Sequence, residues 1–141
     1  MSDDTCLFCG IVSGRTGAVI VNEDQNSLTF LDHRPLFHGH CLLIPKVHFE
    51  TLADLPSAFI APLFQKAQQI SRAVEAAMGA DGTFVAMNNR VSQSVPHLHI
   101  HIVPRKKKDG LKGFFWPRTK YKEQAEMVDV AKRIAKRIEQ D

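Results

Sequence analysis

Three histidines alternate with aliphatic residues in the segment His97-Leu98-His99-Ile100-His101. Side chains in a β-strand alternate between its two faces, so an extended segment projects the three imidazoles from one side. A rise of about 3.3–3.4 Å per residue spaces them roughly 7 Å apart. Neutral imidazoles bind zinc, and they also attack phosphorus or donate hydrogen bonds to phosphate oxygens. The segment therefore predicts a metal site or a phosphoryl-transfer site, against the alternative of a merely polar strand face.

A second candidate for chemistry is the Cys-x-x-Cys pair formed by Cys6 and Cys9, in a chain with three cysteines. An odd count does not indicate a disulfide framework, and the pair's spacing lets both thiolates reach one tetrahedral ion. Such a site needs two further ligands. The alternatives are two reduced, buried cysteines or a reactive thiol pair. Cys41 stands in an apolar run, which favours a place in the core.

Composition is that of an ordinary globular protein. The 141 residues are 44% hydrophobic and 23% charged, with a net charge of +3, which excludes collagenous and disordered chains. No apolar run approaches the ~20 residues that cross a bilayer, and the acidic start lacks the features of a signal peptide. We therefore expect a cytoplasmic protein that binds neither membranes nor nucleic acid. The basic run 105–108 either attracts a polyphosphate or forms a solvated loop.

The apolar pattern predicts the elements that position these residues. Short runs rich in Val, Ile, Leu and Phe, separated by turn signals, favour an antiparallel sheet. Apolar residues at helical spacing predict a long helix that ends at Gly79, and a second amphipathic helix near the C-terminus. The predicted strands are 19–21, 28–31, 41–44, 83–87 and 97–103. The long helix is predicted to start at a cap at Asp54 or Ser57 and to carry its apolar stripe over 63–78, and the last helix covers 127–138. The expected fold class is α+β, in one domain over residues 1–141 with a core at 6–105 and an extension with a helix at 106–141.

The histidine segment resembles the signature of the histidine triad (HIT) family, His-x-His-x-His with apolar residues between. The resemblance extends upstream through the ordered segments Cys6–Val12, Phe30-Leu31-Asp32, Arg34-Pro35, Gly39-His40 and Ile44–His48. It implies a HIT-like antiparallel sheet with one long central helix, and a homodimer that cleaves nucleotides at the α-phosphate. The chain resembles the dinucleoside polyphosphate hydrolase branch more than the small phosphoramidase branch.

The resemblance also implies roles for individual residues. The middle histidine, His99, would be the nucleophile that forms a nucleotidyl-histidine. The implied catalytic residues are His97, His99, His101 and Ser94. The implied substrate-binding residues are Asp32, Asn88, Gln93, Phe8, Ile11 and Leu31. The implied ligands of a structural zinc ion are Cys6, Cys9, His48 and His97.

Three functions remain open at this point. The first is a nucleotide hydrolase or transferase acting on a dinucleoside polyphosphate or a nucleoside phosphoramidate. The second is a zinc-dependent hydrolase in which the three histidines hold a catalytic metal. The third is a non-catalytic nucleotide-binding protein, which would tolerate the loss of His99.

Overall fold

The computed structural model describes residues 3–112 and 118–139. The chain forms two compact units, Met1–Asp109 and Gly110–Asp141. The expected organisation as a single domain stays a prediction.

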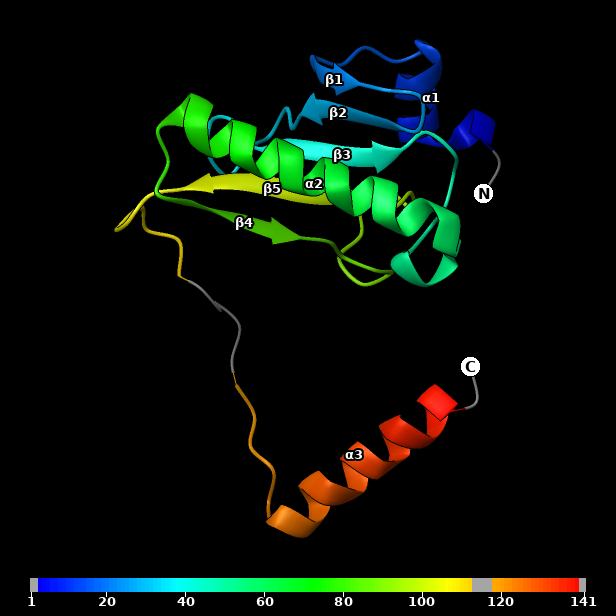
Figure 1. Cartoon of the computed structure of the whole chain (residues 1–141), viewed down its shortest axis with the longest axis vertical. Helices are drawn as coiled ribbons and strands as arrows, with labels where there is room; N and C mark the ends of the chain where they lie inside the picture. Colours follow the sequence, from blue (N-terminus) through cyan, green and yellow to red (C-terminus); the bar gives the residue numbers. More distant parts are fainter. Residues whose placement is uncertain (1–2, 113–117, 140–141) are drawn as a thin grey trace. The chain divides into compact units, whose positions relative to one another are not determined.

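The first unit is built on a five-stranded antiparallel sheet in the order β1-β2-β3-β5-β4 (Figure 1). The strands are β1 (Ile20–Glu23), β2 (Ser27–Leu31), β3 (Cys41–Pro45), β4 (Gly82–Ala86) and β5 (Ile100–Arg105). This architecture confirms the predicted α+β class. The prediction for the last strand was wrong at its start, because β5 begins at Ile100 rather than at residue 97.

One face of the sheet is covered by the long helix α2 (Ser57–Met78), as Figure 1 shows. Its buried side chains recur at three- and four-residue spacing, which gives the helix a single apolar stripe. That stripe consists of Leu63, Ala67, Ile70 and Val74, and it packs against residues of β3 and β5. Gly79 ends the helix with a φ of 58°, a left-handed conformation that favours glycine.

The opposite face carries a short helix that the sequence analysis missed, α1 (Leu7–Ser13). Cys6 caps its start by accepting a hydrogen bond from the backbone N–H of Cys9. Phe8 and Cys9 on α1 pack against Leu28 and Phe30 of β2. Strand β3 contributes to both faces, with Leu42 on the α1 side and Leu43 on the α2 side. The central strands β2 and β3 are thus buried on both sides, whereas β1 and β4 remain largely exposed or half-buried.

The remaining helices are short or lie in the second unit. Two 3₁₀ turns cover Asp3–Thr5 and Leu52–Asp54. The second unit contains α3 (Gln124–Glu139), which confirms the predicted C-terminal helix and has no buried side chain. Across the residues that the structure describes, no helix combines the length and apolar character that crossing a membrane requires.

Candidate functional site

The triad segment enters β5 with its aliphatic and imidazole side chains on opposite sides. Leu98, Ile100 and Ile102 are fully buried in the core beneath α2. The alternation predicted from the sequence is therefore present, although His97 and His99 precede the strand. Each of the three histidines has different surroundings, so they do not act as three equivalent groups.

A cleft of about 790 Å³ lies beside α1, on the face of the sheet opposite α2. Its walls come from α1, the segment before β1, strand β2 and the triad. Among its lining residues are Phe8, Ile11, Leu31, Asp32, Ser94, His99 and His101. The structure thus brings together most of the residues that were predicted to bind substrate or to take part in catalysis. His97, Asn88 and Gln93 do not line this cleft.

His99 is held with one ring nitrogen facing the protein. Its Nδ1 lies 2.7 Å from the backbone oxygen of His97, which can only accept a hydrogen bond. The Nδ1 atom therefore carries the proton, and Nε2 keeps its lone pair. The edge of the Phe8 ring packs against the imidazole, with centroids 5.1 Å apart and an interplanar angle of 88°. This arrangement presents a nucleophilic nitrogen from a ring that is only 5% exposed.

His101 takes the opposite tautomer through a chain of hydrogen bonds that involves His40. The backbone N–H of Leu36 donates to Nδ1 of His40 at 3.1 Å, so the neutral His40 ring carries its proton on Nε2. That Nε2 lies 3.0 Å from Nδ1 of His101 and donates to it. His101 consequently carries its own proton on Nε2, where it can donate to a substrate oxygen or leaving group. His40 was missing from the predicted site residues, although the Gly39-His40 pair belongs to the segments that carried the resemblance.

All three of these imidazoles favour the neutral form. Burial lowers the pKa of His99, against the opposing effects of its hydrogen bond to His97 and of the Asp32 charge. Burial, together with the positive charges that His99 and His40 acquire on protonation, lowers the pKa of His101 to about 4. Burial likewise lowers the pKa of His40, with Asp32 opposing. At neutral pH the site therefore offers a free lone pair on His99 and a neutral N–H donor on His101.

Asp32 lies at the junction of the cleft and this histidine chain. One carboxylate oxygen accepts a hydrogen bond from the Arg34 backbone N–H at 2.9 Å, and the other lies 3.6 Å from Nε2 of His40. Its side chain is 17% exposed, so the carboxylate still reaches the cleft. A carboxylate in this position can accept hydrogen bonds from two vicinal hydroxyls.

The side chain of His97 is directed into a separate cluster with two cysteines. Its Nε2 donates to the backbone oxygen of Pro45 at 2.8 Å, which leaves the lone pair on Nδ1. That Nδ1 lies 3.5 Å from Sγ of Cys6 and 3.5 Å from Sγ of Cys9. Nδ1 of His48 lies 3.3 Å from Sγ of Cys9.

These four groups have the composition and spacing of a tetrahedral metal site. The four ligand atoms all lie within 4.8 Å of one another. Zinc bond lengths of about 2.3 Å to sulfur and 2.0–2.1 Å to nitrogen place neighbouring S and N ligands about 3.6 Å apart. The observed sulfur–nitrogen distances agree with that value. Two thiolates and two imidazoles would fill all four positions of the ion and leave none open for substrate.

A second group of possible ligands, Asp32, His40 and His101, is less suited to a metal. A metal on Nε2 of His40 requires the proton on Nδ1, but that atom already accepts a hydrogen bond from Leu36. The triad histidines also direct their nitrogens to different partners, with His97 facing the cysteines. The geometry thus favours hydrogen bonding over a catalytic metal shared by the three histidines.

Two polar residues of the loop before the triad, Asn88 and Gln93, were candidates for substrate contact. Gln93 uses both ends of its amide for hydrogen bonds to the backbone of Arg90 and Glu50. Both Asn88 and its neighbour Asn89 are exposed, and Asn89 accepts a hydrogen bond from the Leu52 backbone N–H at 2.8 Å. Of the two asparagines, Asn89 therefore has a structural contact and Asn88 is left to face solvent.

Residues 14–108 match the HIT domain family. The chain belongs to the HIT family. Adenylylsulfatase HINT3 of Arabidopsis thaliana is 41% identical over 108 residues, which are 75% of this chain. The present chain spans 55% of the length of that relative.

The match covers a larger share of the relative's own length in two further proteins. Adenosine 5'-monophosphoramidase HNT1 of Saccharomyces cerevisiae is 35% identical, with 77% of this chain and 68% of that protein covered. Protein hit of Bacillus subtilis is 32% identical, with 96% and 95% covered. The wide coverage of the Bacillus protein shows that the similarity extends beyond the HIT domain itself.

Solved structures of HIT proteins share the fold. The structure of SMU.412c from Streptococcus mutans has a TM-score of 0.85 at 34% identity and covers 97% of this chain and 87% of its own. A zinc-bound histidine triad protein from Mycobacterium smegmatis has a TM-score of 0.74 at 35% identity, with 92% and 99% covered. The HIT architecture, in one case with bound zinc, is therefore found in experimentally determined relatives.

Proposed function

We propose that this protein is a nucleotide hydrolase that cleaves its substrate at the α-phosphate through a nucleotidyl-histidine formed on His99. The observation that carries the proposal is the hydrogen bond from His99 Nδ1 to the His97 backbone oxygen at 2.7 Å. This bond keeps the proton of His99 on Nδ1 and leaves a lone pair on Nε2. The His99 ring belongs to the wall of the cleft. Attack by Nε2 on phosphorus splits one displacement into two easier steps.

The cleft is suited to a nucleoside. Phe8, Ile11 and Leu31 supply an apolar wall for a base, and Asp32 supplies a carboxylate for the ribose hydroxyls. An apolar pocket with a few directed polar groups is the usual form of a small-molecule site. The nucleoside would then be anchored beside α1 and β2, with its phosphate against His99.

His101 and Ser94 would serve the phosphate and the leaving group. In the first step the bond from His99 Nε2 to phosphorus forms as the bond to the leaving group breaks. The proton on Nε2 of His101 stabilises a phosphate oxygen or passes to the departing group, and the Ser94 hydroxyl lines the same cleft. Water then attacks the phosphorus as the bond from phosphorus to His99 Nε2 breaks. One proton of the water passes to Nε2 of His101, which restores its starting form, and the nucleoside monophosphate and the free imidazole of His99 are released.

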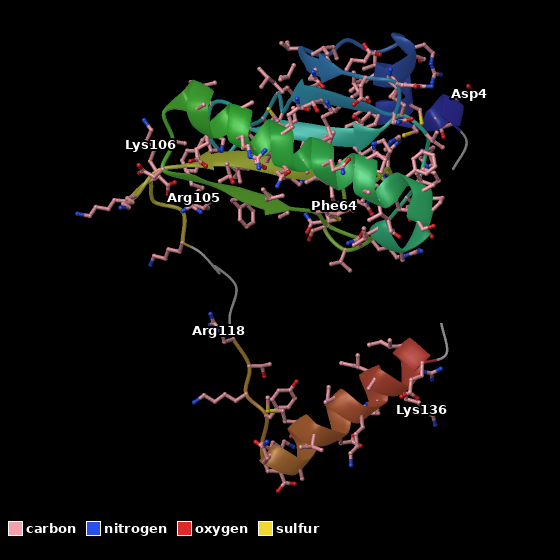
Figure 2. All side chains as sticks on the ribbon, in the orientation of Figure 1. Asp4, Phe64, Arg105, Lys106, Arg118 and Lys136 are labelled. Carbon is pink, nitrogen blue, oxygen red and sulfur yellow. The ribbon has the colours of Figure 1, made fainter. Side chains whose placement is uncertain are left out.

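The charge of the cleft favours a substrate that carries less negative charge than a polyphosphate. Among the described residues that line it, Asp32 carries a negative charge and no Lys or Arg is present. A polyphosphate chain would meet no cation there, whereas a phosphoramidate places less negative charge in the site. The basic residues 105–108 at the end of β5 do not line the cleft. Arg105 donates hydrogen bonds to Asp109, and both Arg105 and Lys106 lie at the end of β5 away from α1 (Figure 2). We therefore propose a nucleoside phosphoramidate or a similar adduct in preference to the dinucleoside polyphosphate that the sequence resemblance favoured. The names of the Arabidopsis and yeast relatives agree with this class.

We also propose a structural zinc ion bound by Cys6, Cys9, His48 and His97. The support is the tautomer of His97, whose lone pair faces the two thiols, and the spacing of the four ligand atoms. When bound, the ion would supply a rigid link between α1 and the triad rather than a Lewis acid for the reaction. The zinc-bound relative from Mycobacterium smegmatis agrees with this proposal.

The homodimer implied by the resemblance remains a proposal. Its support in the first unit is β4, which lies at one end of the strand order and leaves Val85 46% exposed. A paired edge and a covered apolar side chain are what a second copy would provide. Sedimentation velocity at several concentrations would distinguish a dimer from a monomer.

A substrate panel tests the proposed function. The purified protein is incubated with adenosine 5'-phosphoramidate, adenylyl sulfate and diadenosine tetraphosphate, and kcat/KM is measured for each. We expect turnover, with the phosphoramidate or the sulfate adduct preferred by at least tenfold over the tetraphosphate. Preference for the tetraphosphate contradicts the substrate class, and nucleotide binding without turnover contradicts the activity itself.

A further inference from the structure

The loop that leads from β4 to the triad is held in an unfavourable conformation. Arg90 has a φ of 70° and Ser92 a φ of 59°, both in the left-handed region. Residues with a Cβ are disfavoured there, and neither position is glycine. Such conformations persist only when surrounding contacts impose them. The loop therefore depends on bonds to another part of the fold.

Gln93 supplies those bonds from both ends of its side chain. Its Oε1 accepts a hydrogen bond from the Arg90 backbone N–H at 2.8 Å. Its Nε2 donates to the backbone oxygen of Glu50 at 2.7 Å. One bond closes the loop on itself and the other ties it to the segment after β3. The neighbouring contact between Asn89 and the Leu52 N–H joins the same two segments.

Ser94 follows Gln93 directly and lines the cleft beside the triad. We propose that Gln93 is a positioning residue that holds this loop closed and thereby fixes Ser94 for the departing group, an inference that rests on the proposed function. The two bonds already use the oxygen and the nitrogen of the Gln93 amide. A direct contact with the substrate phosphate through Nε2 would compete with the bond to Glu50. The role is therefore distinct from the substrate contact that the family resemblance implied for Gln93.

Local opening of the loop tests the proposal without any need for activity. Gln93→Met keeps the length of the side chain and removes both bonds, and Gln93→Glu keeps the acceptor for Arg90 but places a carboxylate against the Glu50 carbonyl. Gln68→Met, on the exposed side of α2, is the matched control. The assay is trypsin cleavage of the bond after Arg90, followed by mass spectrometry, since the Arg90 side chain is 67% exposed and Val91 is 79% exposed.

We expect cleavage at Arg90 to be about tenfold faster in Gln93→Met, to rise also in Gln93→Glu, and to stay at the wild-type rate in Gln68→Met. Hydrogen exchange at the Arg90 amide should accelerate in parallel in Gln93→Met. Thermal melts confirm that each variant is folded before it is assayed. An unchanged cleavage rate in folded Gln93→Met overturns the proposal.

Kinetics separate positioning from direct binding. If Gln93 acts through Ser94, Gln93→Met should lower kcat about fivefold to tenfold while KM changes less than twofold. In a Ser94→Ala background the same substitution should lower kcat less than twofold, because the two residues act as one unit. An additive effect, or a rise in KM alone, overturns the positioning role. A wild-type protein without turnover contradicts the proposed function instead, whereas the trypsin assay still decides whether Gln93 holds the loop.

Discussion

Protonation of His101 should make the stability of this protein fall as the pH is lowered from 7 to 5. The pKa of His101 in the folded protein is about 4, chiefly because of burial, against an ordinary value of 6.5. A depressed folded pKa means that the unfolded chain binds the proton first, so stability is present above pH 6.5 and is lost as the pH falls toward 4. At pH 5 the unfolded ring is protonated and the folded ring is not.

The size of this effect follows from the shift. Each pKa unit corresponds to about 1.36 kcal/mol, and pH 5 lies about 1.5 units below the ordinary pKa. The loss between pH 7 and pH 5 is therefore about 2 kcal/mol, reduced to about 1–2 kcal/mol because His101 is partly exposed. His99 and His40 add losses of the same sign, since burial lowers the pKa of each.

Urea unfolding of the wild type and of His101→Gln at the two pH values measures this contribution. The variant should lose about 1–2 kcal/mol less than the wild type on acidification. His38→Gln, which replaces an exposed histidine, should retain the wild-type loss. Equal losses of unfolding free energy in the wild type and in His101→Gln would refute the claim that burial keeps His101 neutral in the folded protein.

Three further predictions concern single residues. Phe8→Ala should lower the free energy of unfolding by about 3 kcal/mol in urea titrations, because the ring is 5% exposed and contacts both Phe30 and His99; a loss below about 1 kcal/mol would show that the ring is not part of the core. Cys9→Ser should abolish the bound zinc, expected at about one ion per chain in elemental analysis of the wild type; equal metal content in both proteins would contradict the proposed ligand set. Arg90→Gly should raise the free energy of unfolding by about 0.5 kcal/mol, since glycine relieves a φ of 70° at the cost of a more flexible unfolded chain; a decrease would mean that the side chain of Arg90 contributes more than the backbone strain costs.

Residue pattern predicted the sheet and the long helix well, because both depend on regular burial. The stripe of Leu63, Ala67, Ile70 and Val74 is visible at helical spacing, and the glycine that ends the helix follows it. Helix α1 was missed because only seven residues separate Cys6 from Gly14, too few for a periodic pattern to emerge. Its start is capped by a cysteine thiol, which is outside the usual set of capping residues.

The candidate site shows a similar division. The triad and Asp32 could be nominated from residue type and spacing, together with the resemblance. The different tautomers of His99 and His101 could not, because they depend on a backbone oxygen and on His40, which is 61 positions away from His101. Gln93 was expected to bind substrate, and only the backbone partners supplied by distant segments indicate a structural role.

The central claim is that His99 carries the nucleotidyl group during turnover. Rapid mixing with adenosine 5'-phosphoramidate, an acid-free quench and intact mass spectrometry would detect the intermediate, with His99→Ala as the control and with both proteins assayed in the presence and absence of a chelator. We predict an added AMP on the wild type that is absent from the variant and insensitive to brief chelation. Turnover without any AMP adduct, abolished by the chelator while the fold is retained, would contradict the account and favour a metal-dependent hydrolase.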